Sequence, residues 1–454
     1  MTKKGVSKRF PASNAVVDPQ VLAQELHFKT SGKTAKNRFF KASMSEILAT
    51  YSKTDIKKIG IPTEALVNLY EKWSHGGFGV VLTGNILVDH MHLESSGNVV
   101  ISKETESPEK DRQLKRLAEA AKSNNTLIIG QLSHAGRQCP SNINETPFSA
   151  SDVQLNVRIK TTFGKPKALT IDQIQTEVVD RFVYAAFLSP TTNVRTDKYG
   201  GSVENRVRVI EEIYKAIRAK IPAETGFIIG IKLNSADSQQ SGTLEDVSFI
   251  AKKLDSLGFD FIEISGGSYE NWTLFHKKES TKQREAFFIE FSAAIKPQIK
   301  NAVLYLTGGF RTTHGMVQAI EHNDCDGIGL AKPSTSELDI AKKILEEGVK
   351  AVAFNHYETD FGMAGYQSQA QMWQAGKTTW NESGGDVNIG VSDFSDDNEA
   401  SNFKNGALKH LTKTALDPFL GIFEYDPKTN YSFFGSSLVS CVFGLYARWI
   451  GFKQ

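Results

Sequence analysis

The chain has 454 residues, and its 53 Lys and Arg residues balance 51 Asp and Glu residues, leaving a formal net charge of +2. This length suits one large α/β domain with extensions, or two modest domains. The balanced charge excludes the strongly basic composition that is typical of nucleic-acid-binding proteins and polybasic membrane contacts.

Cysteine usage and the N-terminus indicate the compartment. Cys139, Cys325 and Cys441 have no metal-ligand spacing and are odd in number, which favours a reducing interior over a disulfide framework. The first residues lack the apolar core of a secretory signal. We therefore expect a cytoplasmic protein that acts on a small-molecule substrate, with no nucleic acid and no membrane as partner.

Short apolar runs rich in β-branched residues recur along the chain, and most lead into a turn and then a helical pattern. Such runs are typical of parallel strands buried on both faces. They predict strands at 38–43, 79–84, 127–132, 227–233, 260–265, 303–309 and 326–331. The patterns between them predict helices at 63–77, 109–125, 201–221 and 244–258, the last ending on Gly258 as a left-handed cap.

This alternation predicts an α/β fold, a (β/α)8 TIM barrel, with a doubly wound open sheet as the alternative. A closed barrel needs eight strands, and only seven can be found. The longest interval lies between the strands predicted at 127 and 227, where a helical start over 172–186 runs directly into a Pro-, Asn- and Gly-rich loop. We therefore predict that one strand-helix segment is deleted at the junction Ala186–Phe187.

Unusual residues stand at the ends of four predicted strands, where parallel barrels carry their functional groups. Lys232 lies in an apolar run and must be paired or bind a ligand, because burying an unpaired charge is costly. Gln131 offers an amide that can donate and accept. Gly308-Gly309 and Lys332 follow the last two strands, a common arrangement for phosphate. A satisfied amide, a tight turn and a surface lysine are the plain alternatives, but together the residues predict a phosphorylated ligand such as FMN.

Seven sequence motifs support this prediction and indicate a resemblance to a known family. Over about residues 25 to 350 the chain resembles the old yellow enzyme family, the FMN-dependent NADH:flavin oxidoreductases. The motifs occur in the family's order. They are "KNRFFKASMSE" (36–46), "TGNILVD" (83–89), "GQLSHAGRQ" (130–138), "FLSPTTNVRTDKYGGSVENR" (187–206), "GIKLNS" (230–235), "LTGGFRT" (306–312) and "DGIGLAKP" (326–333).

The resemblance implies a set of cofactor-binding residues. They are Ala42, Ser43, Met44, Ser45, Gly84, Gln131, Lys232, Gly308, Gly309, Ala331 and Lys332. Residues 42–44 would lie against the flavin, and Ser45 near its O4/N5 edge would tune the reduction potential. Gly84 would allow close approach of the ring. Gln131 would bind the pyrimidine end, and Lys232 near N1/O2 would stabilise negative charge.

The phosphate would lie at Gly309 and Lys332, where Lys332 replaces the family's usual Arg. A lysine keeps the charge but loses the bidentate fork, so we expect a weaker grip on phosphate. Two other sets of residues that could be mistaken for catalytic groups are predicted to be structural. His134 is predicted to be a loop histidine, and the stretch 195–199 a packed loop that precedes a helix capped by Ser202.

In members of the family, the segment absent here forms the fourth strand and ends in a His pair, or His and Asn, followed by a Tyr. The resemblance implies that the pair polarises the substrate carbonyl and that the Tyr supplies a proton. No histidine of this chain occurs in a matching motif, so the catalytic residues are unknown apart from Ser45 as a flavin-tuning residue. Reduction of an activated alkene should therefore be impaired.

We expect an FMN-dependent oxidoreductase in which NADH or NADPH reduces the flavin and an activated alkene or another compound accepts the electrons. The alternatives are an inactive flavin-binding paralogue, a splice or gene-model variant, and an unrelated phosphate-binding barrel. The predicted parts are an N-terminal arm (1–25), an FMN-binding barrel domain (26–350), a polar extension (351–430) and an apolar tail (431–454). The tail is short and Ser/Gly-rich for a membrane span, which favours packing on the body.

Overall fold

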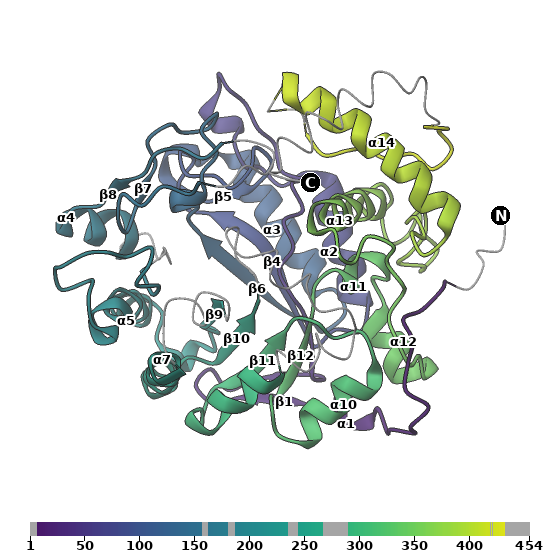
Figure 1. Cartoon of the computed structure of the whole chain (residues 1–454), viewed down its shortest axis with the longest axis horizontal. Coiled ribbons are helices and arrows are strands. Elements are labelled where there is room, and N and C mark those ends of the chain that lie inside the picture. The colour runs from purple at the N-terminus through teal and green to yellow at the C-terminus, as the bar shows by residue number, and fades with distance from the viewer. Residues whose placement is uncertain are drawn as a thin grey trace, which may run out of the picture.

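Seven parallel strands curl around a common interior and form a β/α barrel (Figure 1). The computed structural model describes residues 7–156, 162–179, 187–234, 244–266, 289–417, 419 and 421–431. The barrel strands are β3 (Phe39–Lys41), β4 (Val80–Leu87), β6 (Leu127–Ser133), β9 (Gly230–Asn234), β10 (Phe261–Ser265), β11 (Val303–Thr307) and β12 (Gly327–Leu330). All seven predicted strands are thus confirmed, with ends shifted by a few residues.

The strands pair in the order β6-β4-β3-β12-β11-β10-β9, and every ladder among them is parallel. A short strand, β5 (Val99–Val100), also pairs with the end of β4. This order returns the last strand of the chain to the side of the first, which is the wrapping expected of a barrel. The alternative of a doubly wound sheet with an early reversal is therefore wrong.

Within the described residues no ladder joins β6 to β9, so these two strands form the edges of the sheet. Their burial agrees with that position. All residues of β10, β11 and β12 are buried, whereas no residue of β6 is fully buried and Leu132 is 39% exposed. The open side lies where the fourth strand was predicted to be missing. The junction residues 180–186 themselves lie outside the described residues.

A hairpin of β1 (Leu26–Phe28) and β2 (Lys33–Ala35) packs against the N-terminal part of the barrel interior. Leu26, Phe28 and Ala35 share a hydrophobic cluster with inward residues of the strands, among them Phe40 and Phe261. The hairpin therefore closes the N-terminal end of the barrel and leaves the C-terminal ends of the strands for function. A second small parallel pair, β7 (Phe148–Ser149) and β8 (Lys167–Ala168), belongs to the long connection after β6.

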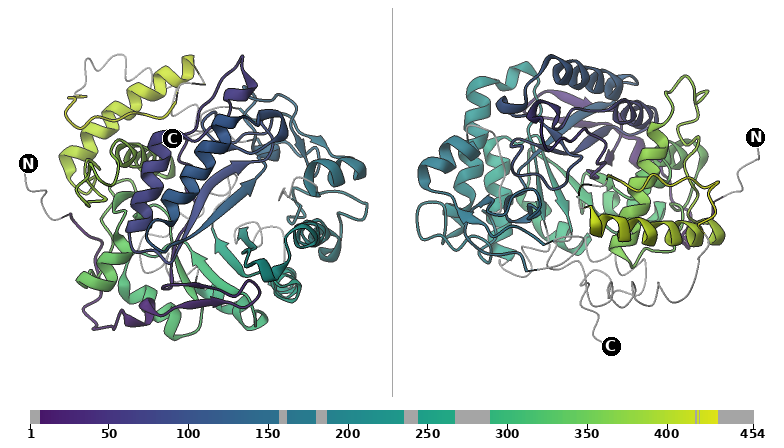
Figure 2. Two further views of the ribbon diagram at one scale, coloured as in Figure 1. Left: turned by 180° about the vertical axis from the view of Figure 1, so that it is seen from behind. Right: turned by 90° about the horizontal axis from the view of Figure 1, so that it is seen from above.

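Helices cover the outside of the sheet (Figures 1 and 2). Around the barrel they are α1 (Gln20–Ala23), α2 (Glu64–His75), α3 (Pro108–Lys122), α4 (Ile171–Gln173), α5 (Val203–Lys220), α7 (Leu244–Leu257), α10 (Thr313–Glu321), α11 (Pro333–Ser336) and α12 (Ile340–Glu347). The four helices predicted from periodicity correspond to α2, α3, α5 and α7. Gly258, at φ 93°, ends α7 in the left-handed region, as predicted.

The helical start predicted at 172–186 is present as α4 followed by a π-helical turn over Ile174–Val179, after which the description stops. A capping box at Thr170 and Gln173 fixes its first turn. The loop at 187–202 is structural, as predicted. Asn193 donates to the carbonyls of Phe187 and Tyr199, and Ser202 accepts from the Asn205 amide as the N-cap of α5.

The stretch predicted as a polar extension contains two long helices, α13 (Phe361–Gly376) and α14 (Asp397–Leu416). Helix α13 lies along α2, and α14 lies outside α13 (Figure 2). A separate hydrophobic cluster including Phe394, Phe403 and Tyr425 joins these helices to the segment at 421–431. Among the described residues no helix has both the length and the apolar composition needed to cross a bilayer. Of the tail predicted at 431–454, all residues after Tyr431 lie outside the described residues.

Candidate functional site at the strand ends

The residues assigned from the sequence gather at one rim of the barrel. Residues 42–45 follow β3. Gly84 and Gln131 lie in the C-terminal halves of β4 and β6, and Lys232 is the middle residue of β9. Gly308 and Gly309 directly follow β11, and Ala331 and Lys332 directly follow β12. Because the strands are parallel, these ends meet at the same edge. The fold therefore brings the whole predicted set to one end of the barrel.

Gln131 is positioned by its neighbours in a single orientation. Its backbone amide donates to Thr83 Oγ1 at 2.9 Å, and its side-chain Nε2 donates to Asn85 Oδ1 at 2.6 Å. The remaining side-chain atom, Oε1, is buried and accepts no hydrogen bond from any described residue. A buried acceptor of this kind carries a desolvation penalty until a donor reaches it. An N–H group such as that of a flavin pyrimidine ring would remove this penalty.

Glu94 continues this network and was not anticipated from the sequence. Ser45 Oγ lies 2.9 and 3.0 Å from its two carboxylate oxygens, and Asn85 Nδ2 donates to the same carboxylate at 2.6 Å. The Ser45 hydroxyl proton is thus directed at Glu94, which leaves its lone pairs for the surroundings. Glu94 therefore fixes Ser45 directly and Gln131 through Asn85.

Lys232 stands at the rim with a carboxylate beneath it. Its Nζ lies 3.5 Å from Oε1 of Glu263, and its side chain is 34% exposed. Lys232 was predicted to be paired or to bind a ligand, and it is paired with Glu263. A cation held by β9 and open on one side fits the pyrimidine end of a flavin, where negative charge develops on reduction.

The turn after β11 fits a phosphate. Gly308 and Gly309 have φ values of 144° and 76°, which only glycine adopts without strain. Such a turn can direct backbone N–H groups at an anion. On the neighbouring strand end, Lys332 is the N-cap residue of α11 and brings a positive charge. Thr307 Oγ1, directly before the turn, is buried and has no hydrogen-bond partner in the described part of the chain.

Position 84 requires a glycine for a reason other than the expected close approach of the flavin ring. A side chain there would collide with the Glu46 carboxylate and the Met44 carbonyl, so the space it leaves is filled by this chain's own loop after β3. The Gly84 amide donates to Glu46 Oε1 at 2.9 Å, and Tyr70 also donates to that carboxylate. Burial and the adjacent Glu46 raise the pKa of Tyr70 well above its ordinary value.

Lys41 completes this buried group on the outer side of β3. It is fully buried, donates to the Leu82 carbonyl at 3.0 Å and lies over the Trp73 ring at 3.8 Å. Its ammonium is 4.0 Å from Glu46. Burial lowers the pKa of Lys41 to about 8, against the opposing effect of Glu46. The group holds the loop that carries residues 42–45 against the barrel.

Asp89, His92 and His134 lie close enough together to suggest a metal site. One ring nitrogen of each histidine is used otherwise, because His92 Nε2 accepts from the Phe148 amide at 2.8 Å and His134 Nδ1 from the Gly136 amide at 3.1 Å. The other nitrogen of His92, Nδ1, lies 3.0 Å from Asp89. Burial alone would raise the pKa of Asp89, but His92 and the Met91 amide lower it well below its usual range. The cluster joins two loops through polar contacts, which agrees with the prediction that His134 is a structural loop histidine.

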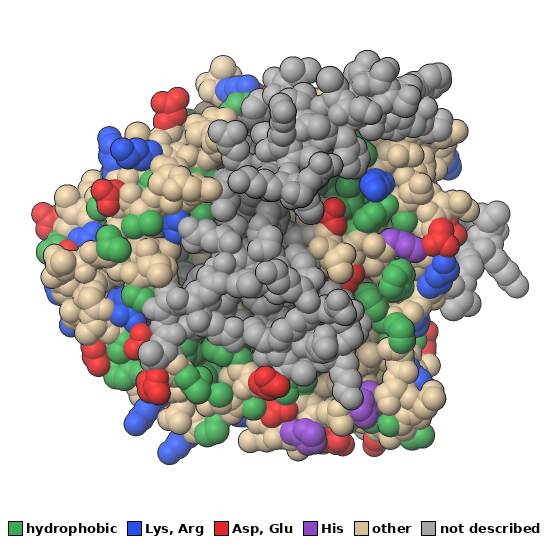
Figure 3. Space-filling view, viewed as in Figure 1, with side chains coloured by type: hydrophobic (Ala, Val, Ile, Leu, Met, Phe, Trp, Pro, Cys, Tyr) green, Lys and Arg blue, Asp and Glu red, His purple; other side chains and the backbone are tan. Residues whose placement is uncertain are grey.

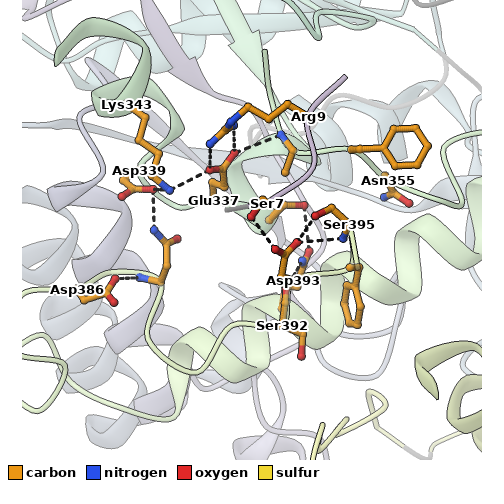
Figure 4. Close-up of a pocket in the computed structure, with 16 residues that line it drawn as sticks. Ser7, Arg9, Glu337, Asp339, Lys343, Asn355, Asp386, Ser392, Asp393 and Ser395 are labelled. Carbon is orange, nitrogen blue, oxygen red and sulfur yellow. Dashed lines mark hydrogen bonds and ion pairs between the residues drawn. The ribbon is translucent and has the colours of Figure 1, made fainter. Parts of the chain in front are cut away.

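A pocket of about 360 Å³ lies elsewhere, between the N-terminal arm, the start of α12 and residues 386–395 (Figure 4). Its charged groups satisfy one another. Arg9 contacts both oxygens of Glu337 at 2.8 Å, Lys343 lies 2.9 Å from Glu337, and Ser7 donates to Asp393 at 2.7 Å. The pocket is therefore a seam between parts of the chain, and no charged group in it is directed at a ligand.

A parallel β/α barrel with polar side chains and glycine turns at its strand ends is typical of enzymes that bind a phosphorylated ligand. The chain belongs to the NADH:flavin oxidoreductase / NADH oxidase family, whose model matches residues 26–186 and 179–350. It is 38% identical to NADH-dependent flavin oxidoreductase nadA of Aspergillus parasiticus, over 72% of this chain and 79% of that protein. It is 34% identical to NADH-dependent flavin oxidoreductase iccE of Talaromyces variabilis, over 67% and 81%.

Solved structures share the fold. The old yellow enzyme homologue from Zymomonas mobilis superposes with a TM-score of 0.58 at 21% identity, over 74% of this chain and 95% of that chain. Morphinone reductase in complex with tetrahydroNAD gives 0.56 at 17% identity, over 73% and 92%. Both are similar over nearly their full lengths, which agrees with a barrel as the common unit.

Proposed function

We propose that this chain binds FMN at the strand-end rim, takes electrons from NADH and passes them to a small-molecule acceptor in the cytoplasm. The observation that carries the proposal is the buried Gln131 Oε1, which has no hydrogen-bond partner among the described residues although its amide nitrogen is fixed. The names of the similar fungal proteins support NADH over NADPH as donor.

Different residues at the rim would hold different parts of the cofactor. Gln131 accepts from the pyrimidine ring, Lys232 provides positive charge at the same end, and Ser45 presents hydroxyl lone pairs held in place by Glu94. The glycine turn and Lys332 hold the phosphate. Bound FMN supplies the hydride chemistry, which no side chain of this protein provides by itself.

We further propose that reduction of activated alkenes is impaired, because the segment that would polarise the carbonyl and donate a proton is missing. Three observations support the missing segment. The sheet is open between β6 and β9 within the described part of the chain. The family matches in two stretches that meet at 179–186. The alignment with nadA has 357 positions, whereas 72% of 454 residues is about 327, so about 30 positions have no counterpart here.

The test is the visible spectrum of the purified full chain before and after anaerobic addition of NADH, with NADPH in parallel. We expect a flavin band that is bleached by NADH, and slow or no turnover of an enone. A protein that remains colourless with added FMN would contradict the proposal. A flavin band that neither nucleotide bleaches would favour the second candidate, a flavin-binding paralogue without activity.

A companion variant tests the missing segment. Inserting the corresponding stretch of nadA after Ala186 should close the barrel and restore turnover of the enone. An insertion of equal length built from Gly and Ser is the matched control, and it should restore nothing. If the original chain already turns over the enone as fast as the restored variant, the claim of impairment is wrong.

A further inference from the structure

We propose that Glu263 sets the effective charge of Lys232 and thereby keeps the reduction potential of the bound flavin low. This inference rests on the proposed function, since it concerns FMN held at the rim. Glu263 would act through Lys232 and is therefore a positioning residue. No sequence motif singled it out.

The strand register places the two residues side by side inside the barrel. In the parallel ladder of β9 and β10, Glu263 is the direct partner of Lys232. Phe261, two residues earlier on β10, packs in the interior cluster with Phe40 and Tyr305. Because alternate residues of a strand share a face, Glu263 points into the same interior. The carboxylate thus lies one layer nearer the rim than the aromatic cluster.

The environment of Glu263 is abnormal for a carboxylate. Its side chain is 0% exposed, and neither of its oxygens has a hydrogen-bond partner among the residues that the structure describes. Asp260, which immediately precedes the same strand, has the hydrogen-bond partners that a buried carboxylate usually has. It accepts from the amides of Ser31 and Ile229 at 2.8 Å each and pairs with Arg218. A buried carboxylate without hydrogen bonds is costly, so packing alone does not explain a glutamate at position 263.

The pair is asymmetric. The side chain of Glu263 is fully buried in the interior, whereas that of Lys232 is 34% exposed at the rim. The distance between Lys232 Nζ and Glu263 Oε1 is 3.5 Å. Seen from the rim, a cation with an anion directly behind it acts as a dipole rather than as a full positive charge. The stabilisation that Lys232 gives to negative charge on a neighbouring ring is therefore reduced. A flavin beside it is harder to reduce than one beside an isolated lysine.

The test is Glu263→Gln in the full chain loaded with FMN, with the midpoint potential measured by dye-coupled photoreduction. The glutamine keeps the shape and removes the charge, so the potential should shift to a more positive value. Sulfite, which binds flavins more tightly when positive charge stands near the pyrimidine, is an independent probe. We expect sulfite affinity to rise about tenfold, equivalent to about 1.4 kcal/mol.

Three further comparisons distinguish an effect of the Glu263 charge from an effect of altered structure. Glu263→Asp keeps the charge but withdraws the carboxylate, and should give a potential between those of the wild type and Glu263→Gln. Glu224→Gln, an exposed position at the other end of the barrel's β9 strand, should leave both readouts unchanged. In a Lys232→Gln background the Glu263→Gln change should shift the potential less, because the cation it screens is gone.

The outcomes are distinguishable. A yellow wild type with a Glu263→Gln variant of unchanged potential and sulfite affinity would overturn the inference and leave the proposed function intact. A wild type that holds no FMN would overturn both. If Glu263→Gln does not fold, Glu263→Asp decides, and a potential equal to that of the wild type would then count against the inference.

Discussion

At the scale of single residues, the rim is organised by carboxylates rather than by the residues that contact a ligand. Glu94 fixes Ser45 and Asn85, and Asn85 in turn fixes the amide nitrogen of Gln131. Among the described residues, no donor reaches the remaining acceptor of this network, Gln131 Oε1. Its orientation exists before any ligand arrives, so little ordering is needed on binding.

Gln131→Leu should weaken FMN binding about tenfold, because it removes one buried hydrogen bond to the cofactor. The dissociation constant is measured by the quenching of FMN fluorescence on titration with apoprotein. Gln138→Leu is the matched control, since Gln138 is exposed a few residues further along the same segment. Equal losses in the two variants would show that the Gln131 side chain does not contact the cofactor.

Lys41 provides a pH-dependent test of the loop that carries residues 42–45. Its pKa is lowered by burial to about 8 in the folded chain, against an ordinary value of 10.5. Between these values the unfolded chain binds the extra proton, so the free energy of unfolding contributed by this group rises with pH. Below about pH 8 both states are protonated and the full cost of burying the charge is present.

Lys41→Met removes this cost, so the wild type should gain stability relative to the variant as the pH rises from about 8 to 10.5. The gain should reach about 3 kcal/mol, from about 1.4 kcal/mol for each unit of pKa. Urea unfolding of both proteins over this range measures the difference, in which other titrations cancel. A difference that does not change with pH would mean that Lys41 is not buried in its charged form.

At the scale of elements, β6 behaves as an edge strand although its sequence is that of a central one. The apolar run at 127–132 predicts burial on both faces, yet Leu132 is 39% exposed. One side of β6 pairs with β4, and within the described residues no strand pairs with its other side. Exposed edges of this kind promote pairing with other chains.

Hydrogen exchange can test the open edge. Amides of β6 that face away from β4 should exchange much faster than the amides of β11, which is paired on both sides by β10 and β12. Exchange resolved to single amides by mass spectrometry or NMR gives the comparison. Uniform protection along β6 would show that another segment covers the edge, and it would weaken the case for a missing strand.

At the scale of the whole molecule, the barrel is held between two segments outside the ordinary β/α alternation. The N-terminal arm lies in the seam described above, against Glu337 and the loop at 386–395 (Figure 4). Helix α13 packs beside α2 and α14 packs on α13, and Trp380, which follows α13, stacks on His75 at 4.0 Å. On the face shown in Figure 3, acidic and basic side chains of the described residues are interspersed.

Arg9→Met should loosen this seam, because Glu337 is buried and would lose its bidentate partner. The cost should be about 2 kcal/mol, since Lys343 still contacts the same carboxylate. Limited proteolysis should then cleave the arm and the loop at 386–395 faster. Lys8→Met is the adjacent control. Lys8 pairs with Asp397 at an exposed site, and loss of that pair should change neither stability nor cleavage.

The sequence predicted the strands well, because runs buried on both faces leave a strong local signal. It missed the carboxylates. Glu263 stands inside a predicted strand, and the argument that required a partner for Lys232 would have applied equally to it. The helices after residue 350 were missed because their buried positions are often polar. Gln371 and Gln374 are buried, yet they are satisfied by Ser392, which only the folded chain brings near.

The seam has a consequence for how the chain is made. Ser7 and its partner Asp393 are 386 residues apart. At a synthesis rate of about 5–20 residues per second, the arm leaves the ribosome roughly 20–80 s before its partner does. For most of that interval the arm lacks its charged partners, because even Glu337 follows Arg9 by 328 residues, while barrel strands can already pair. Docking of the arm is therefore among the last events of folding, and it can occur only after synthesis has passed the barrel.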